Sequence, residues 1–428
     1  MKLMMDILRE LTPLNRVMCS TDYDRTLAYL QDILPFNLIE FPASAEHNGW
    51  VIPPKWDVKR ALILKDGNLL YDGTHHALGV IALSASFNGK VDLEQLRNHL
   101  HFDHRYDDAI PFHFRQQYRT WEREWGFCVT KKFYDALEPG EYTVVIETEE
   151  SDGVLKVLEY THQGDLDEAI VFGANLDHPG VSNDGLSGCV VGIELLRRLL
   201  GKRTKFSYKL VLVQGIIGSE YYLGKMTPDQ RAKLLEGVFL EMLGSRTQLA
   251  LQNTRDGLGN IEHAIASVLS KKQVSHRVGP FQSIIINDEY IWENHGIPMA
   301  SLSRFPYPEY HCDKDNISNI GAERLDEAVD ILEAAVDTLE SSNLVLKKFS
   351  GNVCLSNPKY NLYVDPGQVA FGDIQHEQQR KLRVLMDLIP ALDRTATARS
   401  LAERSGVPEP LVVDYLSKWA KAGLVELR

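Results

Sequence analysis

Two histidines and an aspartate stand in predicted loops where they could bind a metal ion. His178 and Asp184 lie six residues apart in a glycine-containing segment that follows the apolar run 169–174. A helical pattern starts at Leu186, so both side chains are expected at the carboxyl end of a strand, where α/β sheets place their chemistry. His311 lies in a second polar cluster far along the chain. A single histidine usually binds no metal, but imidazole and carboxylate ligands suit zinc, and the three together favour a metal site.

The elements that would position these residues alternate between strands and helices. Apolar runs predict strands near residues 169–174, 207–213, 237–243 and 297–302. Periodic apolar patterns predict helices at residues 186–200, 227–235, 258–270 and 321–341. This alternation is typical of a parallel or mixed sheet with helices on both faces, so the predicted fold class is α/β.

The first 345 residues divide into two predicted bodies. Residues 1–47 carry two helical patterns and a short extended piece, and they are expected to pack with residues 139–345 as one α/β domain. Residues 48–138 contain short strands and turns, which indicates a small β-rich inserted domain. The segments 143–148 and 153–160 predict a hairpin that returns the chain to the main sheet.

The C-terminal segment is predicted to form a separate winged helix. Residues 346–373 would form a linker, within which residues 358–372 are rich in turn formers. Residues 374–428 carry three helical patterns followed by a short wing. The helix that would enter a DNA groove offers only Lys418 and Lys421 as cations. Helices that read DNA present several Arg, Lys, Asn or Gln side chains to the bases, so the pattern favours packing or homo-oligomer formation over nucleic-acid binding.

Composition argues against several classes of function. The chain has 428 residues and a formal net charge of -13. This charge disfavours a general nucleic-acid surface and attraction to an anionic membrane. No apolar run approaches the roughly 18 residues that cross a bilayer, and the five cysteines are scattered without paired spacing. We therefore expect a cytoplasmic protein that makes no membrane contact, and an acidic protein with a metal site fits small-molecule or peptide chemistry.

Several segments in combination resemble the zinc-dependent aminopeptidase superfamily. They are Asn183-Asp-Gly-Leu-Ser-Gly188, Gly218-Ser219, Phe239-Leu-Glu-Met-Leu-Gly244 and Pro308-Glu-Tyr-His-Cys-Asp-Lys-Asp-Asn316. With the segments 108–111 and 125–128, the chain is similar to a bacterial aminopeptidase-like branch that has an inserted domain of unknown function and a C-terminal winged helix. The resemblance covers nearly the whole chain. It implies a zinc-exopeptidase-type mixed sheet flanked by helices.

The resemblance also implies a set of metal ligands. In the superfamily two zinc ions share a bridging aspartate, which Asp184 matches, and His311 matches the last histidine ligand. Glu241 occupies a further ligand position, and His178 replaces the first histidine. The Glu-Glu pair that supplies the superfamily's general base and one more ligand is absent from this chain. The absence of this pair favours one zinc ion over two, held by His178, Asp184 and His311. Glu220 and Glu241 are then the candidate general bases.

Four further residues are predicted to bind substrate. Asp288 and Glu289 resemble an acidic loop that could neutralise a substrate amine. Arg304 could pair with a substrate carboxylate or merely anchor its loop. Tyr310 adjoins the last histidine ligand and is expected beside the substrate.

These patterns together predict a metallohydrolase of the aminopeptidase or exopeptidase type. It would cleave an amide bond of a small peptide or aminoacyl conjugate with metal-activated water. Two alternatives stay open. The same scaffold could carry out zinc-dependent acyl transfer or cyclisation, or it could be a non-catalytic protein that the metal stabilises.

Overall fold

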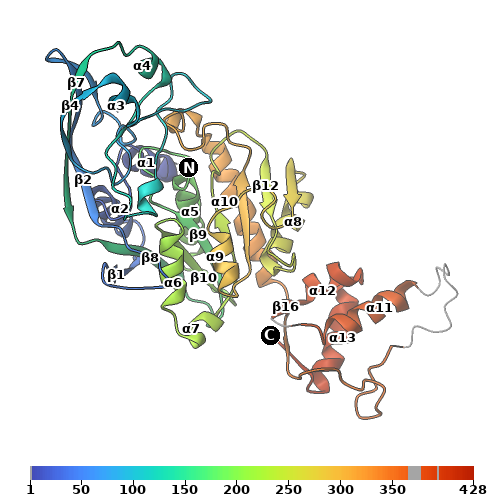
Figure 1. The fold of residues 1–428 in the computed structure, drawn as a ribbon. Helices are drawn as coiled ribbons and strands as arrows, with labels where there is room; N and C mark the ends of the chain where they lie inside the picture. Colours follow the sequence, from blue (N-terminus) through green and yellow to red (C-terminus); the bar gives the residue numbers. More distant parts are fainter. Residues whose placement is uncertain (1, 365–376, 393–394) are drawn as a thin grey trace. The chain divides into compact units, whose positions relative to one another are not determined.

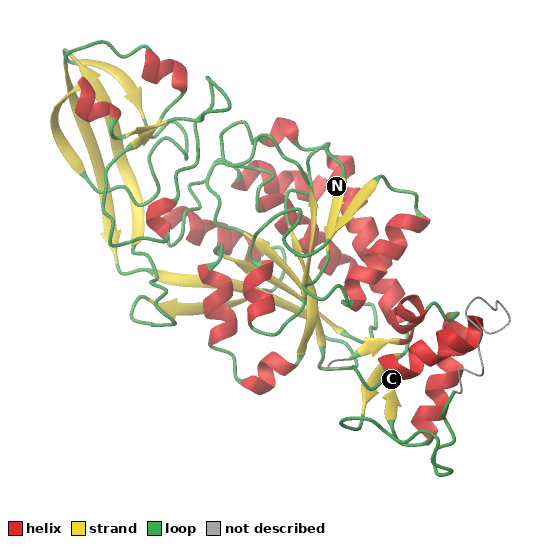
Figure 2. Ribbon diagram, turned by 45° about the vertical axis from the view of Figure 1, so that its right-hand side comes forward, coloured by secondary structure: helices red, strands yellow, loops and turns green. Residues whose placement is uncertain are grey.

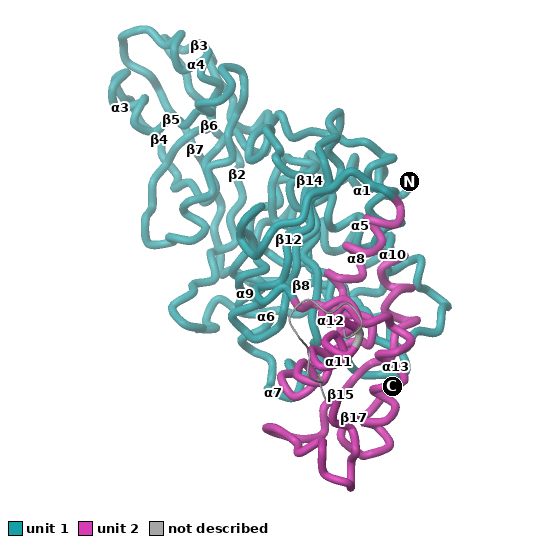
Figure 3. Tube along the Cα trace, turned by 90° about the vertical axis from the view of Figure 1, so that its right-hand side faces the viewer, with its two compact units in different colours: residues 1–257, 273–333 teal, residues 258–272, 334–428 magenta. Residues whose placement is uncertain are grey.

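The chain folds into two compact units. The computed structural model describes residues 2–364, 377–392 and 395–428. The first unit contains Met1–Gly257 and Gln273–Glu333, and the second contains Leu258–Lys272 and Ala334–Arg428 (Figure 3). Within the described residues, no helix is long and apolar enough to cross a membrane.

The first unit is built on an eight-stranded mixed sheet (Figures 1 and 2). In spatial order its strands are β1 (Asn37–Pro42), β8 (Val154–His162), β10 (Ser207–Val213), β9 (Ala169–Asn175), β11 (Leu234–Leu240), β14 (Met299–Arg304), β12 (Leu249–Gln252) and β13 (His276–Gly279). The four strands β10, β9, β11 and β14 run parallel, whereas β1, β8 and β12 pair antiparallel to their inner neighbours. The predicted mixed α/β architecture is therefore confirmed.

The central strands are apolar because both faces of the sheet are covered. Every residue of β9 is buried, as expected for a strand between two helical layers. Helices α1 (Lys2–Leu11) and α5 (Leu186–Leu199) contact each other on one face. Helices α6 (Ile217–Gly224) and α9 (Glu289–Asn294) lie side by side on the other (Figure 1). The remaining elements of the main sheet region are α2 (Thr21–Gln31), α7 (Pro228–Ala232), η2 (Ile317–Asn319) and the first part of α10 (Ala322–Glu340).

The parallel register brings four strand ends to one edge of the sheet. Asn175 at the end of β9 pairs with Val213 at the end of β10, and Leu240 of β11 pairs with Leu302 of β14. Side chains on the loops that follow these strands therefore lie close together, although the loops are far apart in sequence. This edge is where an α/β sheet offers a crevice for a ligand.

A second, four-stranded sheet forms the inserted body in the first unit. Its order is β3 (Asn68–Asp72), β2 (Lys55–Lys65), β7 (Glu141–Ser151) and β4 (Phe87–Asp92). Shorter elements complete this body, namely α3 (Leu93–Arg97), β5 (Leu100–His101), η1 (Arg115–Gln117), β6 (Phe127–Cys128) and α4 (Lys131–Asp135). Its core includes Trp56, Ile63, Phe127, Tyr142 and Ile146.

The predicted hairpin between residues 143–148 and 153–160 is wrong. Strand β7 pairs with β2 and β4 in the inserted sheet, whereas β8 pairs with β1 and β10 in the main sheet. The reason is that Tyr142, Val144 and Ile146 alternate toward the core of the inserted body. The strand 141–151 thus belongs to the inserted sheet, and the turn after Ser151 carries the chain from one sheet to the other.

The second unit has its own core of helices and a small sheet. It contains α8 (Asn260–Lys271), the end of α10, β15 (Leu344–Lys347), α11 (Glu377–Leu388), β16 (Ala396–Thr397), α12 (Ala398–Ser405), α13 (Glu409–Lys421) and β17 (Val425–Leu427). The sheet order is β16-β15-β17, and Leu385, Leu416 and Trp419 are fully buried in the core. Helix α12 ends at Gly406 in the left-handed region, which makes the turn before α13.

The sequence-based description of the tail is only partly tested. The three tail helices form where the helical patterns predicted them. Helix α8, which the sequence placed in the main domain, also belongs to this unit, and β15 crosses the predicted boundary between residues 345 and 346. Part of the predicted linker and the first residues of the winged helix, 365–376, lie outside the described residues. On α13, Lys418 is paired with Asp414 at 2.9 Å. The winged-helix assignment and the absence of DNA binding stay predictions.

Candidate metal centre and substrate pocket

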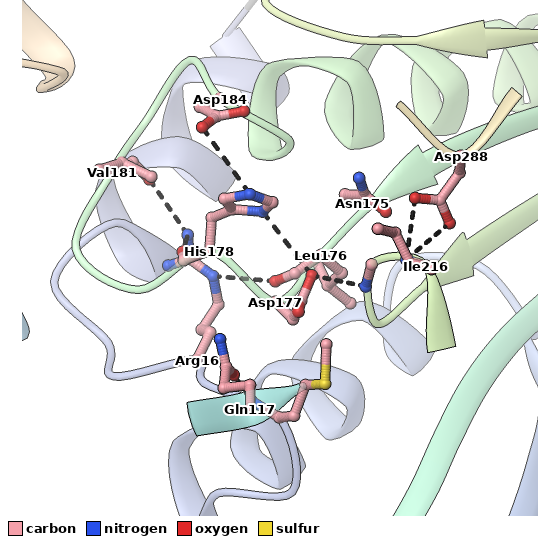
Figure 4. Close-up of polar contacts among 12 residues, drawn as sticks. Arg16, Gln117, Asn175, Leu176, Asp177, His178, Val181, Asp184, Ile216 and Asp288 are labelled. Carbon is pink, nitrogen blue, oxygen red and sulfur yellow. Dashed lines mark hydrogen bonds and ion pairs between the residues drawn. The ribbon is translucent and has the colours of Figure 1, made fainter. Parts of the chain in front are cut away.

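The loop between β9 and α5 carries the first two predicted ligands. Asn175 ends β9, and α5 begins at Leu186 after Gly185, whose φ of +75° favours glycine. Between them His178 and Asp184 approach each other, with 3.8 Å from the Nε2 atom of the histidine to Oδ2 of the aspartate (Figure 4). The structure therefore places the two side chains together at the carboxyl edge of the sheet.

His311 joins this pair from the loop that follows β14. Its Nε2 atom lies 3.1 Å from Oδ2 of Asp184, and His178, Asp184 and His311 bring one ligand atom each to within 4.8 Å of one another. Burial lowers the pKa of His311, which favours the neutral imidazole that binds metals. All three predicted metal ligands are thus in one cluster.

Several buried polar atoms of this cluster lack a hydrogen bond of normal geometry. Among the described residues, both carboxylate oxygens of Asp184, Nε2 of His311 and Oε2 of Glu241 are buried without a hydrogen bond. Leaving such atoms unsatisfied costs about 1–3 kcal/mol each, and more for charged groups. A cation between them would remove that cost, so the donor set and its environment fit a zinc ion.

Asp315 fixes the conformation of the loop between β9 and α5, which carries His178 and Asp184 and is called the ligand loop below. Its Oδ1 accepts hydrogen bonds from the backbone N–H groups of Ser182 at 3.2 Å and Asn183 at 2.7 Å. Its Oδ2 accepts one from the N–H of Asp184 at 2.8 Å. Burial and the neighbouring Asp184 charge raise the pKa of Asp315 to about 7. The carboxylate of Asp184 is thus positioned through its own backbone.

Arg16 holds the other part of the same loop (Figure 4). Its fully buried guanidinium donates hydrogen bonds to the carbonyl groups of Leu176 at 3.3 Å, His178 at 2.5 Å and Val181 at 3.1 Å. A planar guanidinium can bind several carbonyl oxygens at once, which a lysine could not do with the same geometry. Arg16 and Asp315 together keep the loop in one conformation.

Glu241 lies beside Asp184 on the next strand end. It follows β11 directly, and burial together with the charge of Asp184 raises its pKa well above the usual range. Its Oε1 accepts a hydrogen bond from Nδ2 of Asn287, and Oδ1 of Asn287 accepts one from Nδ2 of Asn175 at 3.0 Å. This chain of amides orients the glutamate and leaves Oε2 without a hydrogen bond among the described residues.

A pocket of about 400 Å³ opens beside the metal cluster. It is lined by Phe112, Phe114, Gln117, Tyr118, Asn175, Asp177, His178, Gly215, Ile216, Gln282, Ile286, Asn287, Asp288, Tyr290, Tyr310 and His311. Aromatic and aliphatic side chains such as Phe112, Phe114 and Ile286 line it together with polar ones such as Asp177 and Asp288. Small-molecule sites combine apolar walls with polar groups that orient the ligand. The inserted body supplies Phe112, Phe114, Gln117 and Tyr118, and the strand ends and loops of the main sheet supply most of the polar side chains.

Contacts with His311 join the inserted body to the metal cluster. The backbone N–H of Phe112 donates to the carbonyl of His311 at 2.9 Å, and the two rings lie 5.4 Å apart. The ring of Tyr310 stacks on His311 at 3.8 Å and lines the pocket, where the sequence predicted a substrate contact. The inserted body therefore forms part of the site.

The predicted acidic loop is positioned differently from the expectation. Asp288 lines the pocket, but its carboxylate already accepts hydrogen bonds from the N–H of Ile216 and the hydroxyl of Ser219. Glu289 is fully buried, accepts from Gln252 at 3.0 Å and does not line the pocket. Burial raises the pKa of Asp288 to about 6 and that of Glu289 to about 7. Asp288 thus stabilises the start of α6, and Glu289 stabilises its own loop by accepting from the N–H of Asn287.

Arg304 anchors its loop, which was the second of its two predicted roles. Only 2% of it is exposed, and its guanidinium donates to the carbonyl groups of Leu243 at 3.0 Å and Thr247 at 3.1 Å. It also pairs with Glu327. Arg304 is absent from the residues that line the pocket, so its guanidinium is not available to a substrate carboxylate there.

Glu220 belongs to a different cluster from the predicted ligands. It lies inside α6, where its carboxylate pairs with His47 and His295, and it does not line the pocket. Sequence position had placed it just past the end of β10, close to where the superfamily keeps its acidic pair. The helix turns this side chain toward the loop that contains His47, so this placement gives no support to a role as general base.

Sequence reasoning assigned no role to several residues that hold the site. Asp315 lies in the segment 308–316 without a predicted role of its own, and Arg16 is a lone arginine near the N-terminus that carries no motif. Asp177 accepts from the N–H of Gly215 at 2.8 Å, which ties the ligand loop to the loop after β10. One signal was available, since Asp315 lies within the segment 308–316 that carries the resemblance.

Replacing Asp315 by asparagine should weaken both the fold and the metal cluster. The new NH₂ group would face at least one backbone N–H that now donates to the carboxylate, so we expect a loss of about 1–3 kcal/mol in the free energy of unfolding. Zinc affinity should fall roughly 10- to 100-fold, because the backbone that positions Asp184 would move. Urea denaturation and competitive zinc titration measure the two effects. The exposed Asp107→Asn variant should show neither, and an Asp315→Asn protein that matches it would contradict this role.

Solved structures with the same fold include peptidases. A Clostridium acetobutylicum protein provisionally described as a peptidase has a TM-score of 0.77 at 21% identity, covering 100% of this chain and 96% of its own. A zinc aminopeptidase from Bacillus subtilis has a TM-score of 0.59 at 14% identity, covering 79% of this chain and 94% of its own. At these identities the likeness establishes the fold. The resemblance to the zinc-dependent aminopeptidase superfamily is therefore confirmed as a shared architecture.

A sequence relative and a family model cover most of the chain. The relative is a Clostridium acetobutylicum protein provisionally described as a polysaccharide biosynthesis protein with an aminopeptidase-like domain. It is 25% identical over 346 residues, which are 80% of this chain and 78% of the relative. The family model matches residues 5–342, and this range contains every residue of the metal cluster and the pocket. The chain thus belongs to the family described as a domain of unknown function, DUF4910.

Proposed function

We propose that the protein is a zinc-dependent hydrolase of the aminopeptidase type. The observation that carries this proposal is the set of buried atoms on Asp184, His311 and Glu241 that lack a hydrogen bond, beside a pocket with aromatic and aliphatic side chains in its walls. The shared architecture with zinc aminopeptidases supports it. The substrate would be a small peptide or an aminoacyl conjugate with an accessible amide bond.

His178, Asp184 and His311 would hold one zinc ion. Three protein ligands leave a coordination position open, which is the usual arrangement in catalytic zinc sites. When bound, zinc lowers the pKa of a water molecule toward about 7 and polarises a carbonyl group. The loop contacts of Arg16 and Asp315 fix two of the ligands before the ion binds, so little conformational entropy would be lost.

Glu241 is the residue that we propose as the general base. Its Oε2 has no hydrogen-bond partner among the described residues, whereas Oε1 is held by Asn287. A carboxylate that is oriented through one oxygen can accept a proton at the other and later deliver it to the leaving amine. Asn175 supports this orientation, because its Nδ2 donates to Oδ1 of Asn287.

The pocket favours a substrate with an apolar side chain and a free amine. Phe112, Phe114 and Ile286 offer an apolar surface, and burying an aliphatic or aromatic side chain there is worth roughly 1.5–3 kcal/mol. Two of the polar residues that line the pocket, Asp177 and Asp288, contribute negative charge. Their carboxylates accept hydrogen bonds from the protein, so they would attract an ammonium group through the field and not by direct contact.

A panel of amides tests the proposal. Leucine amide and phenylalanine amide should be cleaved by the zinc-loaded protein, whereas N-acetyl-leucine amide and aspartic acid amide should be cleaved at least tenfold more slowly. The panel should include an N-aminoacyl amino sugar, because the sequence relative is described as acting in polysaccharide biosynthesis. Equal rates on the free and acetylated amides would contradict an aminopeptidase. No turnover of any amide by zinc-loaded protein would instead favour the non-catalytic scaffold.

A further inference from the structure

A second group of metal-ligating side chains lies outside the residues that line the pocket. His47 is in the loop between β1 and β2, Glu220 is in α6, and His295 caps the end of α9. These three residues share no member with the cluster at Asp184. They come from three separate segments, so the fold and not local sequence brings them together.

The geometry within this group is that of a ligand set. The Nε2 atom of His47 lies 2.8 Å from Oε1 of Glu220, and Nε2 of His295 lies 3.3 Å from Oε2 of the same carboxylate. One ligand atom from each residue lies within 4.8 Å of the other two. Ligands bound to zinc at about 2.0–2.2 Å in a tetrahedron lie little more than 3 Å apart, so only small movements would close the site.

The charges in this group also fit a cation. The side chains of His47, Glu220 and His295 are only 15%, 10% and 14% exposed. Within the described residues, no lysine or arginine forms an ion pair with Glu220, and its two recorded ion-pair partners are the histidines. A shielded carboxylate with two imidazoles offers a dication the nitrogen and oxygen donors that zinc prefers.

The fold positions His47 tightly. The hydroxyl of Tyr221 donates to the carbonyl groups of Ala45 and Trp50, each at 2.8 Å, and so ties both ends of the His47 loop to α6. Gly224 faces the imidazole so closely that a Cβ atom there would lie 2.3 Å from the ring. A ligand that is held this way loses little entropy when an ion binds.

We propose that His47, Glu220 and His295 form a second binding site for a zinc-class divalent ion, separate from the pocket site. Water would take the remaining coordination position. The ion would join the loop that leads into the inserted body to α6 and α9. Both helices begin at the pocket, where Ile216 and Ser219 donate to Asp288. The second ion would hold α6 through Glu220 in its first turn and α9 through His295 at its C-terminal end. Its role would be structural, and it does not rest on the proposed hydrolysis.

Metal counting on the full chain tests this site. Protein stripped with a chelator and reloaded with zinc should bind two ions in the parent, one in His47→Ala, one in His178→Ala and none in the double variant. The exposed His75→Ala variant should bind two. His295→Asn gives a second, independent reading of the new site. If His47→Ala and His295→Asn both bind as many ions as the parent, the three residues form only a hydrogen-bonded group and the proposal is wrong.

Two further readouts separate this site from the catalytic one. Cobalt(II) bound to His178→Ala should show the visible absorption of a low-coordinate site with nitrogen and oxygen ligands. The same absorption should be absent from the double variant that carries both His47→Ala and His178→Ala. Zinc should raise the Tm of His178→Ala by about 5 °C at concentrations well above the Kd, because it binds only the folded chain. A His178→Ala protein with neither signal would overturn the proposal. Failure of the hydrolase proposal would instead appear as an inactive parent that still binds both ions.

Discussion

Replacing His311 by alanine should remove the zinc ion from the pocket site and reduce amide hydrolysis to background. The remaining ligands, His178 and Asp184, would supply two donors where zinc requires at least three from the protein. The affinity should therefore fall by far more than the tenfold to hundredfold loss expected for a residue that only orients a ligand. Metal analysis after dialysis and a turnover assay measure both effects.

The fold of this variant should survive, which keeps the experiment informative. His311 lies on a loop, and Phe112 contacts its backbone carbonyl, which alanine retains. His178→Ala and Asp184→Asn should give the same two losses, because each removes one donor from the same cluster. The exposed His75→Ala protein should match the parent. A His311→Ala protein that retains the full zinc content and turnover would show that the cluster is not the metal site.

Replacing Glu241 by glutamine should lower turnover roughly a hundredfold or more while zinc stays bound. Glutamine keeps the oxygen that accepts from Asn287, so the side chain should hold its orientation, but it cannot accept a proton at the other end. The loss should therefore appear in kcat and in kcat/KM together. Steady-state kinetics on leucine amide, with zinc content measured in the same samples, distinguish this result from a loss of metal.

Glu220→Gln provides the matched comparison. The sequence made Glu220 a candidate general base, whereas the structure places it against His47 and His295. We now expect Glu220→Gln to keep most of its turnover at saturating zinc and to lose the ion of the second site. Full activity in Glu241→Gln together with an inactive, zinc-loaded Glu220→Gln protein would restore the sequence-based assignment.

Strong periodicity made much of the fold predictable from the sequence. The apolar run that becomes β9 and the helical pattern of α5 fixed the loop that carries His178 and Asp184. Parallel strands place their carboxyl ends at one edge, so the convergence of this loop with Glu241 followed from the fold class. The grouping of His311 with them relied on the resemblance, because it lies on a long loop after β14 that no periodicity describes.

Tertiary pairing explains most of what the sequence did not predict. The alternating pattern of β7 is equally compatible with a hairpin to β8 and with the inserted sheet, and only the cores of the two bodies decide between them. Arg304 and Asp315 are buried charged residues whose partners are backbone groups on distant loops. Such partners leave no spacing in the sequence. For the same reason, no sequence pattern links His47 and His295 to Glu220, although the fold places them beside it.

Reconstitution of stripped protein with zinc is the most direct test of the central claim. Parent protein freed of metal by a chelator should not cleave leucine amide, and turnover should return as the pocket site fills. The same titration of His311→Ala should restore no activity, although the second site would still take up zinc. Parent protein that fills the cluster of His178, Asp184 and His311 yet cleaves no amide, or that cleaves equally well without metal, would contradict the account.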